Sequence, residues 1–447
     1  MTPAPATTFP PTEPMPVQTV RAPWSDTLSS LRVPNFRLFT FSNVLAMSGT
    51  WMQRIAQDWL VLELSGSVAA VGITVALQFA PMLMFGLHGG LIVDRYSKRM
   101  LLMLTQAATG IFSVILAVLA ITGAIQVWHV FLIAFLVGMV TVIDNPTRQV
   151  FVNELVGPKH LRNAISVNSS VFQLGGLIGP AVAGALLVAV GAGWAFAINA
   201  VACAITVFTL SRLRTSSLVR TAPMPRSKGQ LAEGLRYVRR KPAILWSMVM
   251  MSFISVFALT MPVILAAYAT DVFDVGAAGY GLFNTLLAGG ALVGAIASTR
   301  RTGVRLRTVI ITAGLWGALQ VAGGFMPTEL TFGVLLVVLG VSNLLFITAA
   351  NSLVQMSSNI GIRGRVMSVY VLILLGGQAI GGPVMGWIVE AFGPETGMIV
   401  SGAVPLAAAV VIGIFLARRG HLTMRVSLRT PQQMFSIVRR IDGGTQG

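Results

Sequence analysis

The sequence predicts an all-α membrane protein in which twelve transmembrane helices form two pseudo-symmetric six-helix bundles. Of its 447 residues, 55% are hydrophobic and only 10% are charged, whereas about a quarter of the residues in soluble domains carry a charge. Ten stretches contain no Asp, Glu, Lys or Arg, and a helix needs about 20 mostly apolar residues to cross a bilayer. Repeated glycine patterns relate the two halves of the chain.

Division of the two longest uncharged stretches gives twelve helices. The stretch 100–143 breaks at residues 122–124 and the stretch 163–211 at residues 191–194, because both sites carry the glycines typical of turns. The first stretch reaches a full span only by continuing through Arg54 and Asp58 to about Leu62. The ten stretches are 38–53, 64–93, 100–143, 163–211, 242–270, 275–299, 308–328, 330–362, 366–389 and 396–417.

Composition divides the chain into two bundles, a linker and two tails. Residues 1–33 are rich in Pro and Thr and are predicted to be a disordered cytoplasmic tail. The helical bundles are expected at 34–213 and 242–418, joined by a basic cytoplasmic linker at 214–241 and followed by a second cytoplasmic tail at 419–447. The spacing of Leu231, Leu235 and Val238 favours a short amphipathic helix on the membrane surface. A solvated basic linker explains the same segment equally well.

The basic residues predict the orientation in the membrane. With a cytoplasmic amino terminus, every one of the 31 basic residues except Arg54 falls on the inner side. The positive-inside rule then places both termini in the cytoplasm. A net charge of +17 suggests nucleic acid in a soluble protein, but these charges lie close to helix ends, so we expect a lipid bilayer and no nucleic acid as partner. The outer loops carry only acids, namely Glu63, Asp271, Asp274, Glu329, Glu390 and Glu395.

The remaining chemistry of the sequence is sparse. Cys203 is the single cysteine, the four histidines are scattered, and no phosphate-binding loop is present. We therefore expect no metal site, no cofactor and no enzymatic activity, and we expect a monomer.

The two halves repeat one plan. Gly89-Gly90 corresponds to Gly289-Gly290, and Gly179-Pro180 corresponds to Gly382-Pro383. Parallel repeats of six helices place a transport site between the halves near the middle of the membrane, reached from each side in turn.

Four segments carry a resemblance to a known family. The stretch 90–99, Gly-Leu-Ile-Val-Asp-Arg-Tyr-Ser-Lys-Arg, resembles the signature loop of the major facilitator superfamily, with Ser97 where the family usually has Gly. Segments 49–54, 144–155 and 363–368 resemble the bacterial branch that contains the enterobactin exporter and macrolide-type drug efflux proteins. The resemblance covers roughly residues 36–418. It implies the major facilitator fold and secondary transport in a bacterial cytoplasmic membrane, with the proton gradient as energy source.

The signature loop is interpreted as a gate. The resemblance implies that its acid and its arginines form a charge network on the inner side, which stabilises the outward-facing state. The second half has Gly294 where the first has Asp94, so the network is expected on one side only. The gating-loop residues are Gly90, Asp94, Arg95, Lys98 and Arg99.

Two pairs of opposite charges lie one helical turn apart inside the spans, where charged groups are costly and normally functional. Arg54 and Asp58 are the first pair and a candidate for proton coupling, with a static pair near the outer headgroups as an equal alternative. Asp144 and Arg148 are the second pair. Asp144 is either a proton carrier or a fixed partner of the gating loop, and its position near the cytoplasmic end favours the partner role.

Small residues four apart predict close helix packing in the fifth and eleventh spans. The resemblance to antiporters implies that they form a tight seam between the halves, and ordinary packing is the alternative. These residues are Gly175, Gly179, Pro180 and Gly184 in the fifth span, and Gly382, Pro383 and Gly386 in the eleventh.

Amide side chains among aromatic ones predict a cavity for a bulky amphipathic ligand. Each amide is equally able to join helices by hydrogen bonds. The cavity candidates are Gln57, Gln78, Phe79, Phe172, Gln173, Asn284, Asn343 and Gln378.

These observations predict a secondary active transporter that exports an amphipathic small molecule, such as a siderophore or a drug, in exchange for protons. Uptake or lipid translocation by the same fold remains an alternative. A membrane receptor or scaffold without transport is an alternative of another class.

Overall fold

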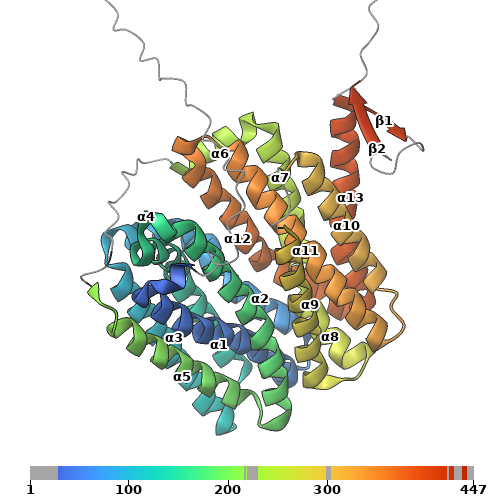
Figure 1. The fold of residues 1–447 in the computed structure, drawn as a ribbon. Helices are drawn as coiled ribbons and strands as arrows, with labels where there is room; N and C mark the ends of the chain where they lie inside the picture. Colours follow the sequence, from blue (N-terminus) through green and yellow to red (C-terminus); the bar gives the residue numbers. More distant parts are fainter. Residues whose placement is uncertain are drawn as a thin grey trace, which may run out of the picture.

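The computed structural model describes residues 29–215, 218, 230–298, 304–419, 422–426 and 435–439. Residues 1–28 of the predicted tail, residues 216, 217 and 219–229 of the linker and parts of the tail after residue 419 lie outside these residues. Figure 1 shows two groups of helices side by side, α1–α5 in the first half and α7–α13 in the second. The predicted all-helical membrane fold is thereby confirmed.

The first half and the linker contain six α-helices. A short 3-10 helix, η2 (Ser29–Arg32), precedes them. They are α1 (Pro34–Ser65), α2 (Val68–Arg95), α3 (Lys98–Ile121), α4 (Val127–Ala189), α5 (Ala192–Ser211) and the linker helix α6 (Gln230–Arg240).

The seventh span is divided into four pieces. Pro262 at the start of α8 has no backbone N–H, which accounts for the break between η4 and α8. The pieces are α7 (Pro242–Phe253), the π-helix η4 (Ile254–Ala258), α8 (Met261–Ala267) and the π-helix η5 (Tyr268–Val272). The remaining helices are α9 (Gly276–Ser298), α10 (Leu306–Gly323), α11 (Glu329–Ser357), α12 (Ile360–Phe392) and α13 (Pro394–Arg419). An antiparallel strand pair, β1 (Leu422–Val426) and β2 (Phe435–Arg439), follows the last helix.

Eleven segments of the described chain are long and apolar enough to span a membrane. The one predicted span that is not among these eleven is the first, α1. It is 32 residues long but carries Arg54 and Asp58, which lower its hydropathy. The chain is thus a multi-pass membrane protein.

The fourth and fifth spans both lie within α4 and are separate spans, as predicted. They are Val127–Gly157 and Asn163–Ala189, and the helix is broken between them at Gly157, whose φ is 64°. Glycine tolerates this left-handed conformation because it has no Cβ.

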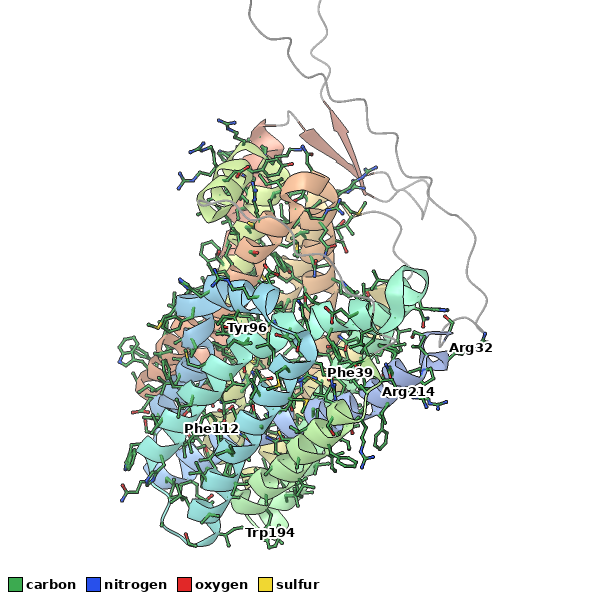
Figure 2. The ribbon with its side chains drawn as sticks, turned by 90° about the vertical axis from the view of Figure 1, so that its left-hand side faces the viewer. Arg32, Phe39, Tyr96, Phe112, Trp194 and Arg214 are labelled. Atoms are coloured by element: carbon green, nitrogen blue, oxygen red, sulfur yellow. The ribbon has the colours of Figure 1, made fainter. Side chains whose placement is uncertain are left out.

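Successive helices run in opposite directions, so the bundle has two ends. The end of the bundle that carries α6 and the turn after α2 is called the α6 end. The other end of the bundle is called the opposite end. Figure 2 shows Trp194 at the opposite end of the first half, with Tyr96 and Arg214 toward the α6 end. The linker helix α6 lies against α12 (Figure 1), where Glu233 forms an ion pair with Arg365. The predicted linker helix is therefore present.

The two halves touch closely at the opposite end. A Cβ built on Gly382 would lie 2.4 Å from the carbonyl oxygen of Gly72, and one on Gly184 would lie 2.9 Å from the Cα of Gly281. Real Cβ atoms do not approach this closely, so glycine is required at these contacts. By contrast, Gly179 packs against α1 within its own half, where a Cβ would lie 2.6 Å from the Cβ of Trp51.

The predicted packing residues therefore have two roles. Those that lie between α2 and α12 or between α4 and α9 join the halves, and those that face α1 pack within the first half. Gly184, Gly382 and Gly386 belong to the former group, and Gly175 and Gly179 to the latter.

Polar contacts reinforce the opposite end. Glu390 of α12 accepts hydrogen bonds from the Oγ of Ser67 at 2.5 Å and from the backbone N of Ala69 at 2.7 Å. A carboxylate at a helix amino terminus is stabilised by the unpaired N–H groups there. Glu390 thus caps α2 from the other half of the molecule.

We expect Glu390→Gln to loosen this closed end, because a neutral amide oxygen is a weaker acceptor and loses the attraction of the helix terminus. That attraction contributes about 0.3–1 kcal/mol, so the population open at this end should rise about two- to fivefold. Spin labels at positions 63 and 395, in a Cys203→Ser background, would report the distance between the halves by electron spin resonance.

Glu329→Gln is the matched control, since it removes an acid at the same end. Distance distributions that agree in the two variants would contradict a closing role for Glu390.

At the α6 end, two of the gating-loop residues, Lys98 and Arg99, bond within the first half. Arg99 donates to the backbone oxygens of Leu210 at 2.7 Å and Ser211 at 2.6 Å, and Lys98 pairs with Glu154 at 3.9 Å. The predicted role of this loop in an outward-facing charge network stays a prediction.

Candidate functional site

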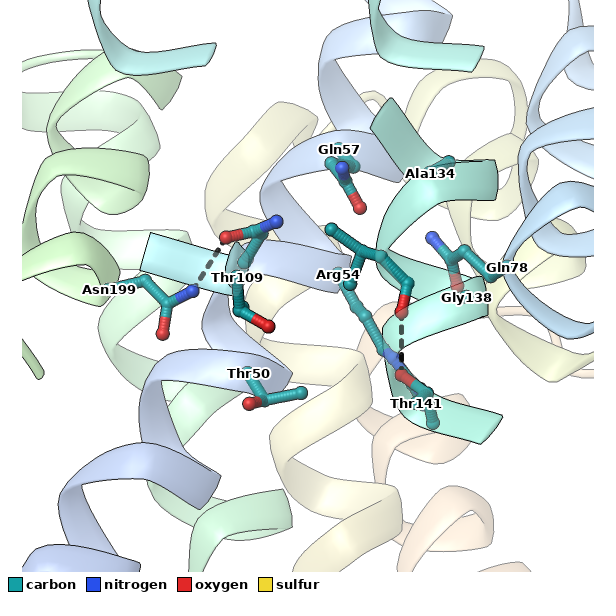
Figure 3. Close-up of a pocket in the computed structure, with 11 residues that line it drawn as sticks. Thr50, Arg54, Gln57, Gln78, Thr109, Ala134, Gly138, Thr141 and Asn199 are labelled. Carbon is teal, nitrogen blue, oxygen red and sulfur yellow. Dashed lines mark hydrogen bonds between the residues drawn. The ribbon is translucent and has the colours of Figure 1, made fainter. Parts of the chain in front are cut away.

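A polar pocket lies inside the first half, between α1, α2, α3, α4 and α5. At 1.5 Å per residue, Arg54 lies about 17 Å from Ser65, where α1 ends, and Gln78 lies about 15 Å from Val68, where α2 begins. Both residues are therefore well inside the span. The cavity is small, about 20 Å³, which is room for a water molecule. Figure 3 shows its lining, which consists of Thr50, Gln53, Arg54, Gln57, Gln78, Thr109, Ala134, Val137, Gly138, Thr141 and Asn199.

The guanidinium of Arg54 is held by two aromatic rings. Its central carbon lies 5.5 Å from the ring centre of Trp51 and 5.1 Å from that of Phe79. Such cation–π contacts stabilise a cation without neutralising its charge. Within the described chain, Arg54 forms no hydrogen bond or ion pair. The predicted direct pairing with Asp58 is therefore not formed, because the side chain lies on the rings instead.

Amide groups surround this cation. The Oε1 of Gln53 accepts hydrogen bonds from the Oγ of Ser113 at 2.5 Å and from the Nδ2 of Asn199 at 2.6 Å. Gln57 is 1% exposed, and its Nε2 has no partner among the described residues. Leaving a buried donor unpaired costs about 1–3 kcal/mol of folding free energy. The Nε2 of Gln57 is thus available to donate to an acceptor that enters the pocket.

Asp58 connects the two halves. Its side chain is 3% exposed and accepts hydrogen bonds from the Nε2 of Gln78 at 3.3 Å and from the hydroxyl of Tyr280 at 3.5 Å. Tyr280 belongs to α9 in the second half and stacks on Trp59 with ring centres 5.7 Å apart. The two donors to this buried acid are neutral, and one of them comes from the other half.

Asp144 has a different environment. Arg148 pairs with it at 2.8 Å, and Thr105 and Gln106 donate to it at 2.8 Å and 3.1 Å. Arg148 also donates to the Oδ1 of Asn43 on α1. This buried charge is neutralised and fully hydrogen-bonded, which is the arrangement of a stable structural pair. A partnership with the gating loop remains a prediction.

The structure brings four of the five first-half cavity candidates together around Arg54 and Trp51. Gln57 and Gln78 line the pocket and Phe79 lies under Arg54. Phe172 packs edge to face on Trp51 at 5.7 Å, and Gln173 is half-buried.

The second-half candidates are dispersed. Asn284 and Gln378 donate to carbonyl oxygens one turn earlier on their own helices, those of Tyr280 and Leu374. Asn343 has an unpaired buried Oδ1. Sequence reasoning missed Gln53, Thr141 and Asn199 as pocket residues. Gln53 could have been found, because it lies one turn before Gln57 on the same helix.

In the part of the chain that the structure describes, no group of three or more His, Cys, Asp or Glu side chains is placed to hold a metal ion. Two helical halves that close against each other at one end, with a polar pocket within the span, define a membrane transporter of the major facilitator type.

A family model described as transmembrane secretion effector matches residues 25–443. The chain belongs to this family, within the major facilitator superfamily.

Curated relatives agree with this assignment. The enterobactin exporter EntS of Citrobacter koseri is 24% identical over 402 residues, which is 89% of this chain and 94% of that protein. The staphyloferrin A transporter of Staphylococcus aureus is 28% identical over 172 residues, 38% of this chain and 43% of that protein.

A solved structure shares the fold. A POT family transporter in complex with 5-aminolevulinic acid superposes with a TM-score of 0.70 at 14% identity, covering 86% of this chain and 96% of the other. The chain is thus a transporter of small molecules, homologous to siderophore exporters, and not an enzyme.

Proposed function

We propose that this transporter exports an amphipathic small molecule across a bacterial cytoplasmic membrane in exchange for protons, with both termini in the cytoplasm and the opposite end facing outward. One observation carries the proposal. Asp58 is a buried acid with neutral hydrogen-bond donors, and one donor, Tyr280, belongs to the other half. A change of charge on Asp58 therefore acts directly on the contact between the halves.

The comparison of the two buried acids supports this assignment. Asp144 keeps a bidentate arginine partner and can hold its charge throughout a transport cycle. Asp58 lacks such a partner, so gain and loss of a proton there is compatible with its surroundings. The homology to the enterobactin exporter EntS supports export as the direction.

Flux from proteoliposomes loaded with a test compound would examine the proposal. Siderophores, macrolides and lipophilic cations are the test set. We expect an acidic exterior to accelerate release of at least one compound, because inward proton flow would drive its outward movement. A protonophore should abolish the acceleration.

The same assay separates export from uptake. Accumulation of an external compound under an acidic exterior would overturn exchange and favour a proton-coupled uptake permease. An absence of gradient-dependent flux for every compound that binds would overturn both.

A further inference from the structure

We propose that the pocket around Arg54 is a subsite for a neutral carbonyl group, an amide or an ester, of the transported molecule. This inference rests on the proposed function and names the chemical class of the substrate. Two hydrogen-bond donors converge on the pocket without a protein acceptor, the guanidinium of Arg54 and the Nε2 of Gln57.

The first step concerns the missing acceptor. The threonines of the lining use their hydroxyl hydrogens on their own helices: Thr50 donates to Ala46 and Thr141 to Val137, both at 2.8 Å. The Oε1 of Gln53 is engaged by Ser113 and Asn199. The Oδ1 of Asn199 is an acceptor without a donor. The unpaired donors of the lining are therefore Arg54 and Gln57, and an oxygen atom without hydrogens can accept from both.

The second step concerns size and surroundings. A cavity of about 20 Å³ admits a single oxygen atom in place of a water molecule, but no larger group. The rings of Trp51 and Phe79 cover Arg54, and Phe172, which is 49% exposed, continues this aromatic surface. A carbonyl oxygen attached to an aromatic or apolar body fits both features.

The third step concerns charge. Arg54 and Asp58 lie one helical turn apart, so their formal charges cancel while Asp58 is ionised. An anionic group would add an uncompensated negative charge inside the membrane span, which is costly. An anionic group would also favour the protonated form of Asp58, so that the anionic substrate and the proton would cross the membrane together. A neutral group avoids this coupling and is compatible with exchange.

Three matched probes would test the subsite on the purified full-length protein in lipid nanodiscs, with calorimetry as the measurement. 2-Naphthamide presents a neutral carbonyl, 2-naphthoate an anionic one, and 2-ethylnaphthalene none. We expect the amide to bind most tightly at neutral pH. Arg54→Gln should weaken its binding about tenfold or more, and Gln57→Leu about fivefold.

Two further measurements distinguish a binding role from a structural one. Gln57→Leu should keep or raise the unfolding temperature, because it removes an unpaired buried donor, while it weakens binding of the amide. Arg305→Gln, which removes an exposed arginine at the start of α10, should leave binding unchanged.

The outcomes separate this inference from the proposed function. Equal affinity of wild type and both pocket variants, tighter binding of the naphthoate, or no binding of the amide would overturn the subsite. Gradient-driven flux with Arg54-independent binding would overturn the subsite alone. Arg54-dependent binding without flux would overturn the transport function and retain the subsite.

Discussion

Asp58→Asn is expected to reduce gradient-driven export to the rate of protein-free liposomes while leaving the fold intact. Asparagine has the same shape: its Oδ1 can still accept from Gln78, and its Nδ2 can donate to the hydroxyl oxygen of Tyr280 in place of the bond that the hydroxyl donates to Asp58. The closed contact between the halves is therefore retained. The variant has no proton to gain or lose, so the proton gradient can no longer drive substrate movement. The measurement is release from loaded proteoliposomes with an acidic exterior.

Two controls make this result specific. Substrate exchange at equal pH on both sides should persist in Asp58→Asn, because it needs binding and conformational change but no proton. Asp271→Asn, which alters an exposed acid in η5, should export at the wild-type rate. Gradient-driven export at the wild-type rate in Asp58→Asn would remove Asp58 from the coupling role.

Gly382→Ala should cause the second large effect, a failure to close the opposite end. Its new methyl group would lie 2.4 Å from the carbonyl oxygen of Gly72, so α2 and α12 must separate. Overpacking of this kind costs about 1–3 kcal/mol, which shifts the equilibrium roughly fivefold or more toward states open at this end. Spin-label distances between the halves and the rate of export would both report the change.

Gly364→Ala provides a control on the same helix, since a Cβ at Gly364 meets no atom within 4 Å. It should leave distances and export unchanged. Gly72→Ala should reproduce the effect of Gly382→Ala, because its Cβ would lie 2.3 Å from the carbonyl oxygen of Gly382. Wild-type spin-label distances and wild-type export in both Gly72→Ala and Gly382→Ala would show that the glycine contact between α2 and α12 does not limit transport.

Hydropathy and charge predicted the helical fold well, because each span must satisfy its own backbone hydrogen bonds and present apolar side chains to lipid. They underestimated the length of the fourth span. Its charge-free stretch ends at residue 143, but Asp144 and Arg148 neutralise each other inside the helix, so the span continues to Gly157. Charge-free stretches identify spans, but they do not show where each span ends.

The site was predicted only in part. The spacing of Arg54 and Asp58 permits an ion pair, but it contains no information about Phe79 on α2, which attracts the guanidinium instead. The bond between Asp58 and Tyr280 joins residues 222 positions apart, and it depends on how the two halves pack. Amide positions were equally ambiguous, because Gln378 meets its acceptor on its own helix whereas Gln57 does not.

The break at Gly157 gives the molecule a mechanical property. Thr141 in the pocket wall lies on the span before the break, and Gly184 at the contact with α9 lies on the span after it. The two spans run in opposite directions and meet at this glycine. A change of the angle between them would couple a displacement beside a bound molecule to a movement at the contact with the second half.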